Sequence, residues 1–396
     1  MTEQHLDDDA ARVVESAREV VAKFPPASSP LVEVMGAWFD AGLAWIHFPE
    51  GLGGLGLSRN YQSLANRILK EAGGPEPRTV NIVGWGICAP TIAQYAPFEQ
   101  ARAWLRPLAT GEEIWCQLFS EPGAGSDLAG LATRAVRDGD DWIVNGQKVW
   151  NSLAHLARWG ILITRTDPDV PKHRGMTYFV VDMHSPGIEV RPLRQLTGQS
   201  QFNEVFLSDV RIPDAYRFGE VGNGWRVATS TLTNERSNLG DRATVRNSGP
   251  IGDALTTWHE HPELQTPALR DRLVRLWSRA EVSRLNADRA RVAAAAGQLG
   301  PASSVSKLVN AELTQAVYAF CMDMLGPEAT LYGDYDSYDA DNDPAPIQRL
   351  FLRSRTTTIE GGTSEIVRNV LGERVLGLPS DLKDDRDRPW KDVPRS

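Results

Sequence analysis

The chain has 396 residues, 41% of them hydrophobic and 23% charged, and a formal net charge of −9 at pH 7. This composition is typical of a globular protein with a sizeable core, and the acidic balance argues against non-specific binding to nucleic acid. No apolar run reaches the roughly eighteen residues of a membrane span, and the polar, acidic N-terminus lacks the apolar stretch of a secretory signal. We therefore expect no membrane insertion and a cytoplasmic location.

The first block of the chain has a helical pattern. Residues 11–24 and 29–48 carry apolar side chains at three- and four-residue spacings, and each segment ends at prolines or at a Gly-rich stretch. A third segment, residues 58–74, begins with a candidate N-cap at Ser58 and closes on two glycines. We predict an N-terminal helical domain over residues 1–114.

The period then changes from helical to alternating. Short runs rich in β-branched and aromatic residues are separated by Gly, Pro, Asp and Asn, with no helical segment between them. This spacing predicts an antiparallel sandwich or barrel over residues 115–223. The predicted strands lie within residues 142–152, 160–167, 175–183, 187–193 and 203–213.

The third block returns to helices. Residues 268–296 and 303–325 have long amphipathic patterns and would form most of a C-terminal helical bundle over residues 224–379. The charged, proline-broken tail, residues 380–396, is expected to be mobile or to contact a partner. The predicted fold is α+β, with helical, β and helical domains in that order.

One Gly-rich motif, Glu121-Pro-Gly-Ala-Gly-Ser-Asp127, stands at the entrance to the β block. Small residues let a ligand approach the backbone, and successive N–H groups can bind an anion. Ser120 and Ser126 supply hydroxyls and Trp150 a flat ring. The alternative interpretation is an ordinary Gly-rich turn followed by a hairpin.

Cysteine and histidine give no sign of a metal site. Cys88, Cys116 and Cys321 are sparse and widely spaced, as expected for reduced packing residues. His155 and His173 have no Cys, Asp or Glu partner at metal spacing, nor does the pair His259 and His261. We expect these histidines to have surface or packing roles, and we expect no metal.

The motif EPGAGSD, followed by NGQKVWNS, resembles the flavin-binding segment of the acyl-CoA dehydrogenase family. Further matches follow the family's order: Phe48-Pro49-Glu50, GMTYFVVD, NEVFLSDVRIP, GNGW and IEGGTSEIVRNVLGERVLGLP. The resemblance implies an FAD enzyme of lipid or fatty acid β-oxidation that desaturates an acyl-CoA between its α and β carbons. It also implies transfer of the hydride to flavin N5 and of the electrons to an electron-transfer flavoprotein. The implied assembly is a homo- or hetero-oligomer, a dimer of dimers.

The resemblance also implies cofactor-binding residues. The flavin ring and its polar edge would be contacted by Gln117, Phe119 and Ser120, and its second side by Trp150 and Ser152. The FAD diphosphate or the CoA end would be bound by Gly125 and Ser126, and the ribityl or adenosine part by Thr363 and Glu365. Because the family builds this site from two subunits, Thr363 and Glu365 can serve a neighbour's FAD.

The catalytic base of many members precedes the Gly-Thr pair of the last motif, and here that position is Gly361. Glu360 is displaced by one residue, which in an extended segment turns a side chain to the other face. A second branch of the family carries the base on a helix within a Glu-Arg pair, matched by Glu235 and Arg236. We predict that Glu235 removes the α-proton and that Arg236 holds the CoA arm. A solvated Glu and a structural ion pair are the alternatives.

Gly361 retains a predicted role. The resemblance implies that its backbone N–H donates to the thioester carbonyl, together with a ribityl hydroxyl of the flavin. Its missing side chain would leave room for a branched or bulky acyl group. The sequence itself does not define the acyl group.

Two elements of the family pattern are missing. We find no Arg-x-x-Phe-Gly motif in the region that contains Arg242, Arg246 and Arg270, and a later Gly-Gly is replaced by Leu325-Gly326-Pro327. Either other residues hold FAD in a homo-oligomer, or the partner in a heteromer supplies these contacts. A non-catalytic subunit that completes a partner's site remains an alternative.

An oxidase-type relative remains a second alternative. Glu235 argues against the monooxygenases of the family, which need no base for an α-proton. No Gly-x-Gly-x-x-Gly fingerprint follows a strand, so a nicotinamide acceptor is not expected.

Overall fold

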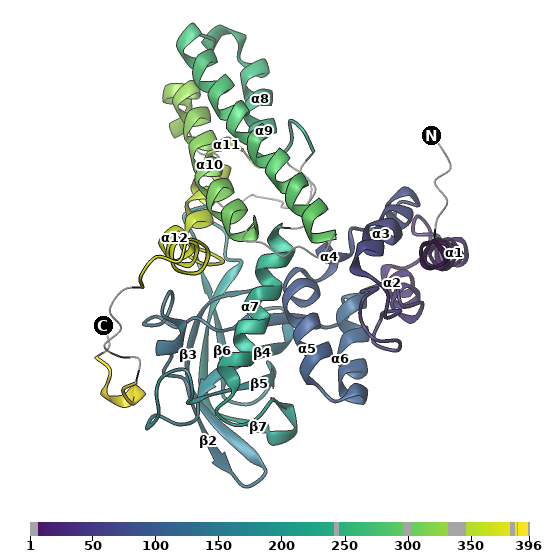
Figure 1. The fold of residues 1–396 in the computed structure, drawn as a ribbon, viewed down its shortest axis with the longest axis vertical. Helices are drawn as coiled ribbons and strands as arrows, with labels where there is room; N and C mark the ends of the chain where they lie inside the picture. Colours follow the sequence, from purple (N-terminus) through teal and green to yellow (C-terminus); the bar gives the residue numbers. More distant parts are fainter. Residues whose placement is uncertain are drawn as a thin grey trace. The chain divides into compact units, whose positions relative to one another are not determined.

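The computed structural model describes residues 7–240, 245–295, 302–331, 346–380, 385 and 387–394, and within these ranges the side chains of residues 235–240, 294–295 and 302–303 are not described (Figure 1). The chain divides into two compact units. Unit 1 comprises Met1–Leu193, Gln201–Asn234 and Asp384–Ser396, and unit 2 comprises Arg194–Ser200 and Glu235–Lys383. The N-terminal helices and the β block thus belong to the same unit.

Unit 1 begins with helices, as predicted. Asp7 caps the first of them by accepting a hydrogen bond from the Ala10 N–H at 2.8 Å, and Ser58 caps the turn Arg59–Tyr61 (η1) that leads into the third. The second helix ends at Asp40, well before the predicted end, because Gly42 turns the chain at φ +74°. The bounds are α1 Asp8–Lys23, α2 Leu31–Asp40, α3 Gln62–Glu71, α4 Pro77–Val80, α5 Ala89–Tyr95 and α6 Phe98–Thr110.

The β block is one eight-stranded, mostly antiparallel sheet. Its order is β6-β7-β3-β2-β4-β5-β8, and β1 pairs in parallel with β4 outside this path. All five predicted strands are present, as β3 to β7, while β1, β2 and the two-residue β8 were not predicted individually. The bounds are β1 Ile114–Leu118, β2 Arg134–Asp138, β3 Asp141–Ser152, β4 Ala157–Arg165, β5 Met176–Asp182, β6 Ile188–Leu193, β7 Phe202–Pro213 and β8 Arg217–Phe218.

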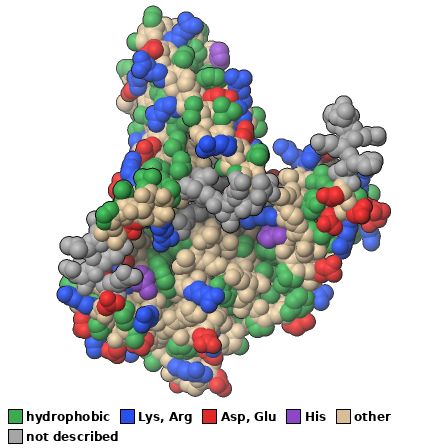
Figure 2. All heavy atoms as spheres, viewed as in Figure 1, with side chains coloured by type: hydrophobic (Ala, Val, Ile, Leu, Met, Phe, Trp, Pro, Cys, Tyr) green, Lys and Arg blue, Asp and Glu red, His purple; other side chains and the backbone are tan. Residues whose placement is uncertain are grey.

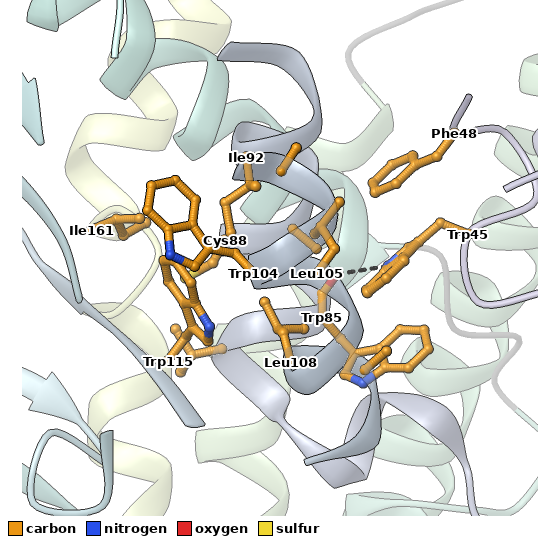
Figure 3. Packing of buried hydrophobic residues seen from close by; sticks show 14 of the residues in the cluster. Trp45, Phe48, Trp85, Cys88, Ile92, Trp104, Leu105, Leu108, Trp115 and Ile161 are labelled. Atoms are coloured by element: carbon orange, nitrogen blue, oxygen red, sulfur yellow. Dashed lines mark hydrogen bonds between the residues drawn. The ribbon is translucent and has the colours of Figure 1, made fainter. Parts of the chain in front are cut away.

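Strands β4 and β5 are buried on both faces, which explains their continuous apolar sequences. Ile161 and Tyr178 face a core shared with the N-terminal helices, whereas Leu162 and Phe179 face a second core inside the β block. Figure 3 shows the helical side of the shared core, where the Trp45 indole donates to the carbonyl of Trp85 at 3.2 Å. Most of the tryptophans are core residues, as expected: Trp38, Trp45, Trp85, Trp104, Trp115, Trp142, Trp159 and Trp390.

Unit 2 is helical. Both long predicted helices are present, α9 Pro267–Ala295 and α10 Ala302–Leu325, and with α8 Pro250–Glu260 they enclose a core around Phe320. The segment continues with α11 Ile347–Ser354 and α12 Ser364–Val370. Helix α7, Gly224–Gly240, begins in unit 1 and its last residues are assigned to unit 2.

The surface and the cysteines agree with the composition. Figure 2 shows acidic and basic side chains interspersed on the visible face. Cys88, Cys116 and Cys321 are reduced and buried, and burial raises the pKa of the Cys321 thiol to about 12. Among the described helices, none is both long and apolar enough to cross a membrane. The described residues contain no group of three or more His, Cys, Asp or Glu side chains placed to hold a metal ion.

Candidate active site

The Gly-rich motif follows directly from strand β1, and two hydrogen bonds join this junction to β3. The Asn151 side chain donates to the carbonyl of Gln117 at 2.8 Å, and the Val149 N–H donates to the carbonyl of Ser120 at 2.9 Å. Trp150 lies between these two β3 residues. The structure therefore brings Gln117 and Ser120 next to Trp150 where β1 lies beside β3, although Gln117 and Trp150 are more than thirty positions apart in the sequence.

A buried ion pair fixes the start of the motif. The Lys148 ammonium, which is fully buried, lies 2.9 Å from a Glu121 carboxylate oxygen and donates to the carbonyl of Phe119 at 3.0 Å. The same carboxylate accepts the N–H groups of Ala132 at 2.6 Å and Thr133 at 2.9 Å. Burial acts to raise the pKa of Glu121, but Lys148 and these donors hold it below its ordinary value. Burial lowers the pKa of Lys148, and Glu121 opposes that change. Glu121 therefore ties both ends of the loop to the sheet.

The middle of the loop is open to a ligand. Glu121 and Ala124 exchange two backbone hydrogen bonds of 3.1 and 3.0 Å across the turn. Beyond this turn Gly125 and Ser126 are exposed, and a Cβ built on Gly125 would meet no atom within 4 Å. The alternative interpretation of this segment, an ordinary Gly-rich turn followed by a hairpin, describes its backbone correctly, since β2 and β3 pair antiparallel. The open face at Gly125 is what a binding role requires in addition.

Trp150 is held in an unusual conformation. Its φ of 63° lies in the left-handed region, which a bulky side chain rarely adopts, and 60% of its surface is exposed. The ring makes a T-shaped contact with Phe202, at 6.0 Å between centroids. An exposed aromatic ring on a strained backbone is a typical feature of a ligand site.

The two remaining predicted residues of this edge differ in exposure. Ser152, the last residue of β3, is partly exposed. The Phe119 side chain is buried and packs edge-on against Tyr178 at 5.8 Å. Phe119 therefore contributes its ring to the core, while its carbonyl accepts from Lys148.

These residues fit a flavin. A flat ring system with hydrogen-bonding groups along one edge needs an aromatic surface, hydroxyls and a backbone that admits close approach. Trp150, Ser126 and Gly125 supply these features. In addition, the buried oxygen Asn151 Oδ1 accepts no hydrogen bond from the described residues, so an acceptor is left for a ligand donor.

In unit 2 the last motif forms the turn before α12. Gly361 and Gly362 have φ values of 64° and 99°, and the Lys307 ammonium donates to the carbonyl of Gly362 and, at 3.1 Å, to that of Thr357. Thr363 caps α12 by accepting the Ile366 N–H at 3.1 Å. The neighbouring Glu365 is exposed in the first turn of the helix.

The two glutamates considered as the base are placed differently. Glu235 and Arg236 lie in the last turns of α7, and their side chains fall outside the described part of the structure. Glu360 is held by the guanidinium of Arg353 through hydrogen bonds of 3.2 and 3.0 Å.

The structure describes two of the three arginines in the region that lacks the Arg-x-x-Phe-Gly motif. Arg246 lies over the Trp277 ring at 5.2 Å and 3.8 Å from Glu281, so it is engaged within its own unit. Arg270 is exposed on α9, and Arg242 lies outside the described residues. Leu325-Gly326-Pro327 forms the end of α10 and the start of a 3-10 turn, Gly326–Thr330 (η6).

Unit 2 contains a cavity of about 380 Å³. Its walls combine apolar side chains with a few polar ones, the mixture expected of a small-molecule site. Lys307 and Glu360 lie on its wall, which places the cavity next to the turn at Gly361. The apolar residues on the wall include Ile251, Trp277, Ala280, Ala311, Leu313 and Val317.

The order of helical, β and helical segments, with an open loop and an exposed tryptophan at the sheet edge, defines a flavin-dependent dehydrogenase fold of the acyl-CoA type. Family models match the chain in the same order: "Acyl-CoA dehydrogenase, N-terminal domain" over residues 2–112, the middle domain over 116–210 and the C-terminal domain over 222–376. The chain belongs to the acyl-CoA dehydrogenase family, whose members are oxidoreductases with FAD as their cofactor.

Several mycobacterial proteins are similar to the chain. Acyl-CoA dehydrogenase FadE34 of Mycobacterium tuberculosis is 42% identical over 378 residues, which cover 95% of this chain and 50% of FadE34. Acyl-CoA dehydrogenase IpdE1 of the same organism is 38% identical over 347 residues, 87% of this chain and 86% of IpdE1. The chain thus spans half the length of FadE34 and most of IpdE1.

Solved structures resemble it over nearly the whole chain. The structure entitled "Tcur3481-Tcur3483 steroid ACAD" has a TM-score of 0.72 and 25% identity, and covers 96% of this chain and 100% of its own. The ChsE4-ChsE5 complex from Mycobacterium tuberculosis has a TM-score of 0.69 and 28% identity with the same coverage.

Two features of the site were not predicted from the sequence. Lys148 and Glu121 stand within the quoted motifs, but nothing in their spacing signalled a buried pair. Asn151 likewise joins β3 to β1. The available signal was the register: Lys148 lies in the same alternation as Trp142 and Val144, and a lysine on a buried face requires a partner.

Proposed function

We propose that the chain catalyses the α,β-dehydrogenation of an acyl-CoA thioester with FAD. The observation that carries the proposal is the junction of β1 and β3. The exposed Trp150 lies between the two residues that bond to Gln117 and Ser120, and the open loop at Gly125 and Ser126 follows Ser120 in the chain. Family membership supplies the reaction class. When bound, FAD supplies the acceptor for the hydride that leaves the β carbon.

The chain's own residues then have distinct tasks. Glu235 takes the proton from the α carbon, and the backbone N–H of Gly361 polarises the thioester carbonyl, which makes that proton more acidic. Arg236 binds the CoA arm. Gln117, Ser120 and the residues around them orient the cofactor.

The pairing of Glu360 supports Glu235 as the base. Arg353 holds both oxygens of Glu360, so this carboxylate is already engaged by a guanidinium within its own unit. A base that removes an α-proton has to face the substrate instead. We therefore assign proton removal to the α7 residue.

We further propose that the enzyme works as a heteromer and passes its electrons to an electron-transfer flavoprotein. The missing Arg-x-x-Phe-Gly motif and the engagement of Arg246 within unit 2 support a partner that adds contacts to an FAD which this chain already binds. The similar ChsE4-ChsE5 structure is a complex of two chains. Exposed apolar side chains on α9 also favour assembly, namely Val274, Val282, Leu285 and Val292.

For the acyl group we propose a bulky substrate, with a polycyclic steroid-derived chain as the leading class. The cavity of about 380 Å³ beside Gly361 has the largely apolar walls that a bulky hydrocarbon group needs. A similar structure is entitled "Tcur3481-Tcur3483 steroid ACAD". Faster turnover of short straight-chain substrates than of bulky ones would contradict this assignment.

The decisive experiment is the visible spectrum of the purified chain before and after anaerobic addition of an acyl-CoA panel. We expect a flavin spectrum that bleaches with substrate. Glu235→Gln should retain the flavin and lose the bleaching, whereas the matched control Glu360→Gln should bleach as the unaltered chain does. Bleaching by Glu235→Gln, or its loss in Glu360→Gln, would refute the assignment of the base.

Two other outcomes identify the alternatives. A colourless chain that gains flavin only with a copurifying relative would indicate a subunit that completes a partner's site. Oxygen consumption during turnover, without need of an electron-transfer flavoprotein, would indicate an oxidase-type enzyme.

A further inference from the structure

The end of the chain is attached to unit 1, although its sequence is charged and rich in breakers. We call Asp385 and residues 387–394 the C-terminal strap. The Trp390 N–H donates to the carbonyl of Val170 at 2.9 Å, and the Lys391 N–H donates to that of Pro168 at 3.0 Å. Pro389 also forms an antiparallel bridge with Pro171. The strap therefore packs its short 3-10 helix, Trp390–Asp392 (η9), against the loop between β4 and β5, residues 166–175.

Trp390 joins this loop to the Gly-rich motif. Only 9% of its surface is exposed, and its indole N–H donates to the carbonyl of Gly130 at 3.1 Å. Its ring covers the guanidinium of Arg165 at 4.8 Å. Arg165 is itself buried and donates to the carbonyls of Ala129 and Lys172, both at 2.6 Å. The Trp390 ring and the Arg165 guanidinium thus pack together with the loop of residues 166–175 and with the loop that contains Ala129 and Gly130.

A second contact makes the same connection through charge. The Lys172 ammonium lies 2.5 Å from Asp385 of the strap and 3.0 Å from Asp127 of the Gly-rich motif. Lys172 is largely buried, with 12% of its side chain exposed. The Asp127 side chain is 59% exposed and that of Asp385 32%, but two carboxylates that share one largely buried cation hold their geometry better than an isolated exposed pair does.

We infer that the C-terminal strap positions the Gly-rich loop, residues 121–131, for its ligand, and that Trp390 is the positioning residue. The inference rests on the proposed function, because that function assigns Gly125 and Ser126 to the FAD diphosphate or the CoA end. The strap touches the loop from the side of Asp127 and Gly130. It leaves the open face at Gly125 uncovered.

The physical argument is one of preorganisation. A glycine-rich loop has large conformational freedom, and fixing it on binding costs entropy. The Glu121–Lys148 pair holds its first residue, and Glu121 also accepts the N–H groups of Ala132 and Thr133 just beyond its end. Between them, Ala129 and Gly130 are held by Arg165 and Trp390. Loss of the Trp390 anchor loosens this part of the loop and weakens ligand binding without removing any group that touches the ligand.

The test uses the full chain, the variants Trp390→Ala and Trp390→Phe, and the control Lys391→Ala. Lys391 lies on the strap, but its pair with Asp169 is exposed and contributes little. Hydrogen exchange of peptides within 121–133 reports on the loop independently of any ligand. The Gly130 and Leu131 N–H groups, which bond to Asp127 and Leu128, are the reporters.

We expect Trp390→Ala to speed exchange in this segment by about tenfold and to weaken FAD or acyl-CoA binding by about tenfold. Phe keeps a ring over Arg165 but loses the hydrogen bond to Gly130. The exchange rate and ligand affinity of Trp390→Phe should therefore lie between those of Trp390→Ala and those of the unaltered chain. Lys391→Ala should match the unaltered chain. Little change in the turnover rate at saturating FAD and acyl-CoA would distinguish positioning from catalysis.

Three results would overturn the inference: unchanged exchange in Trp390→Ala, faster exchange with unchanged ligand affinity, or an equal effect of Lys391→Ala. If the unaltered chain binds neither FAD nor acyl-CoA, the proposed function fails. The exchange measurement still decides whether the strap orders the loop. If Trp390→Ala does not fold, Asp385→Asn tests the second contact, and unchanged exchange and affinity there would count against the strap.

Discussion

Replacing Lys148 by Met removes the ammonium from the buried pair while keeping most of the side-chain volume. Lys148 is fully buried and Glu121 is 8% exposed, with 2.9 Å between Nζ and Oε1. Breaking one side of a buried pair costs about 3–5 kcal/mol because the other charge stays behind unpaired. The lost hydrogen bond to the Phe119 carbonyl adds about 1 kcal/mol. The N–H groups of Ala132 and Thr133 still solvate the carboxylate and offset part of this cost. We expect a net loss of about 3 kcal/mol at pH 7.

The loss of stability in Lys148→Met should depend on pH in a way that identifies Glu121 as its cause. In the unaltered chain the pKa of Glu121 is lowered, so its contribution to stability is present above its unfolded pKa and is lost as pH falls through the folded pKa. Without Lys148 burial dominates and raises the pKa of Glu121. The deficit of Lys148→Met should therefore be largest near neutral pH and shrink as pH falls toward 5.

Urea denaturation followed by circular dichroism and tryptophan fluorescence measures this effect, with a double-mutant cycle through Glu121→Gln. The double variant should recover at least about 1 kcal/mol relative to additivity, because no charge then remains buried. As a control, Arg191→Met breaks an exposed pair with Glu189 and should cost less than about 1 kcal/mol. The reasoning would be refuted if the stability losses of Lys148→Met and Glu121→Gln were additive, or if the stability deficit of Lys148→Met grew as the pH fell.

Three further predictions concern single positions. Burial first, and Arg59 second, lower the pKa of His47 to about 4. The unfolded state therefore binds the proton first, and the free energy of unfolding should fall by about 2 kcal/mol from pH 7 to pH 5. Urea midpoints at both pH values should show a weaker fall in His47→Gln. Gly361→Ala should lower the free energy of unfolding by about 1–2 kcal/mol, since the φ of Gly361 is 64°. As a control, Gly372→Ala replaces a glycine without a positive φ and should have a melting temperature close to that of the unaltered chain. Trp150→Ala should change the melting temperature little, because the ring is 60% exposed, but flavin titration should show at least about tenfold weaker binding.

Much of the fold follows from local patterns. The alternation in residues 142–152 and 203–213 predicts two strands that pair along most of their length, and Ser58 marks a cap that the structure contains. Such features depend on neighbours within a few residues, so the sequence states them directly. The end of α2 is different: Gly42 turns there against the carbonyl of Gly54, which a Cβ would meet at 2.7 Å. That contact depends on a residue twelve positions away.

The predicted site residues divide in the same way. Gln117, Ser120 and Trp150 were found through the family's motifs, and the structure brings them to one sheet edge through bonds made by Asn151 and Val149. The roles of Glu235 and Arg236 remain predictions from the same motifs. What no motif indicated is the support behind these residues, the buried Lys148 pair above all.

The C-terminal strap shows why such support escapes a pattern. Counting residues in 380–396 finds charges and prolines, which predict a mobile or partner-contacting tail. The attachment includes two buried or partly buried side-chain anchors: Trp390, whose indole donates to the carbonyl of Gly130, and Asp385, whose partner Lys172 lies more than two hundred residues earlier. Composition averages over a segment, whereas a strap needs one aromatic anchor and one ion pair with the right partners. A lone tryptophan in a charged tail is therefore the signal to examine, because leaving so large an apolar surface in water is costly.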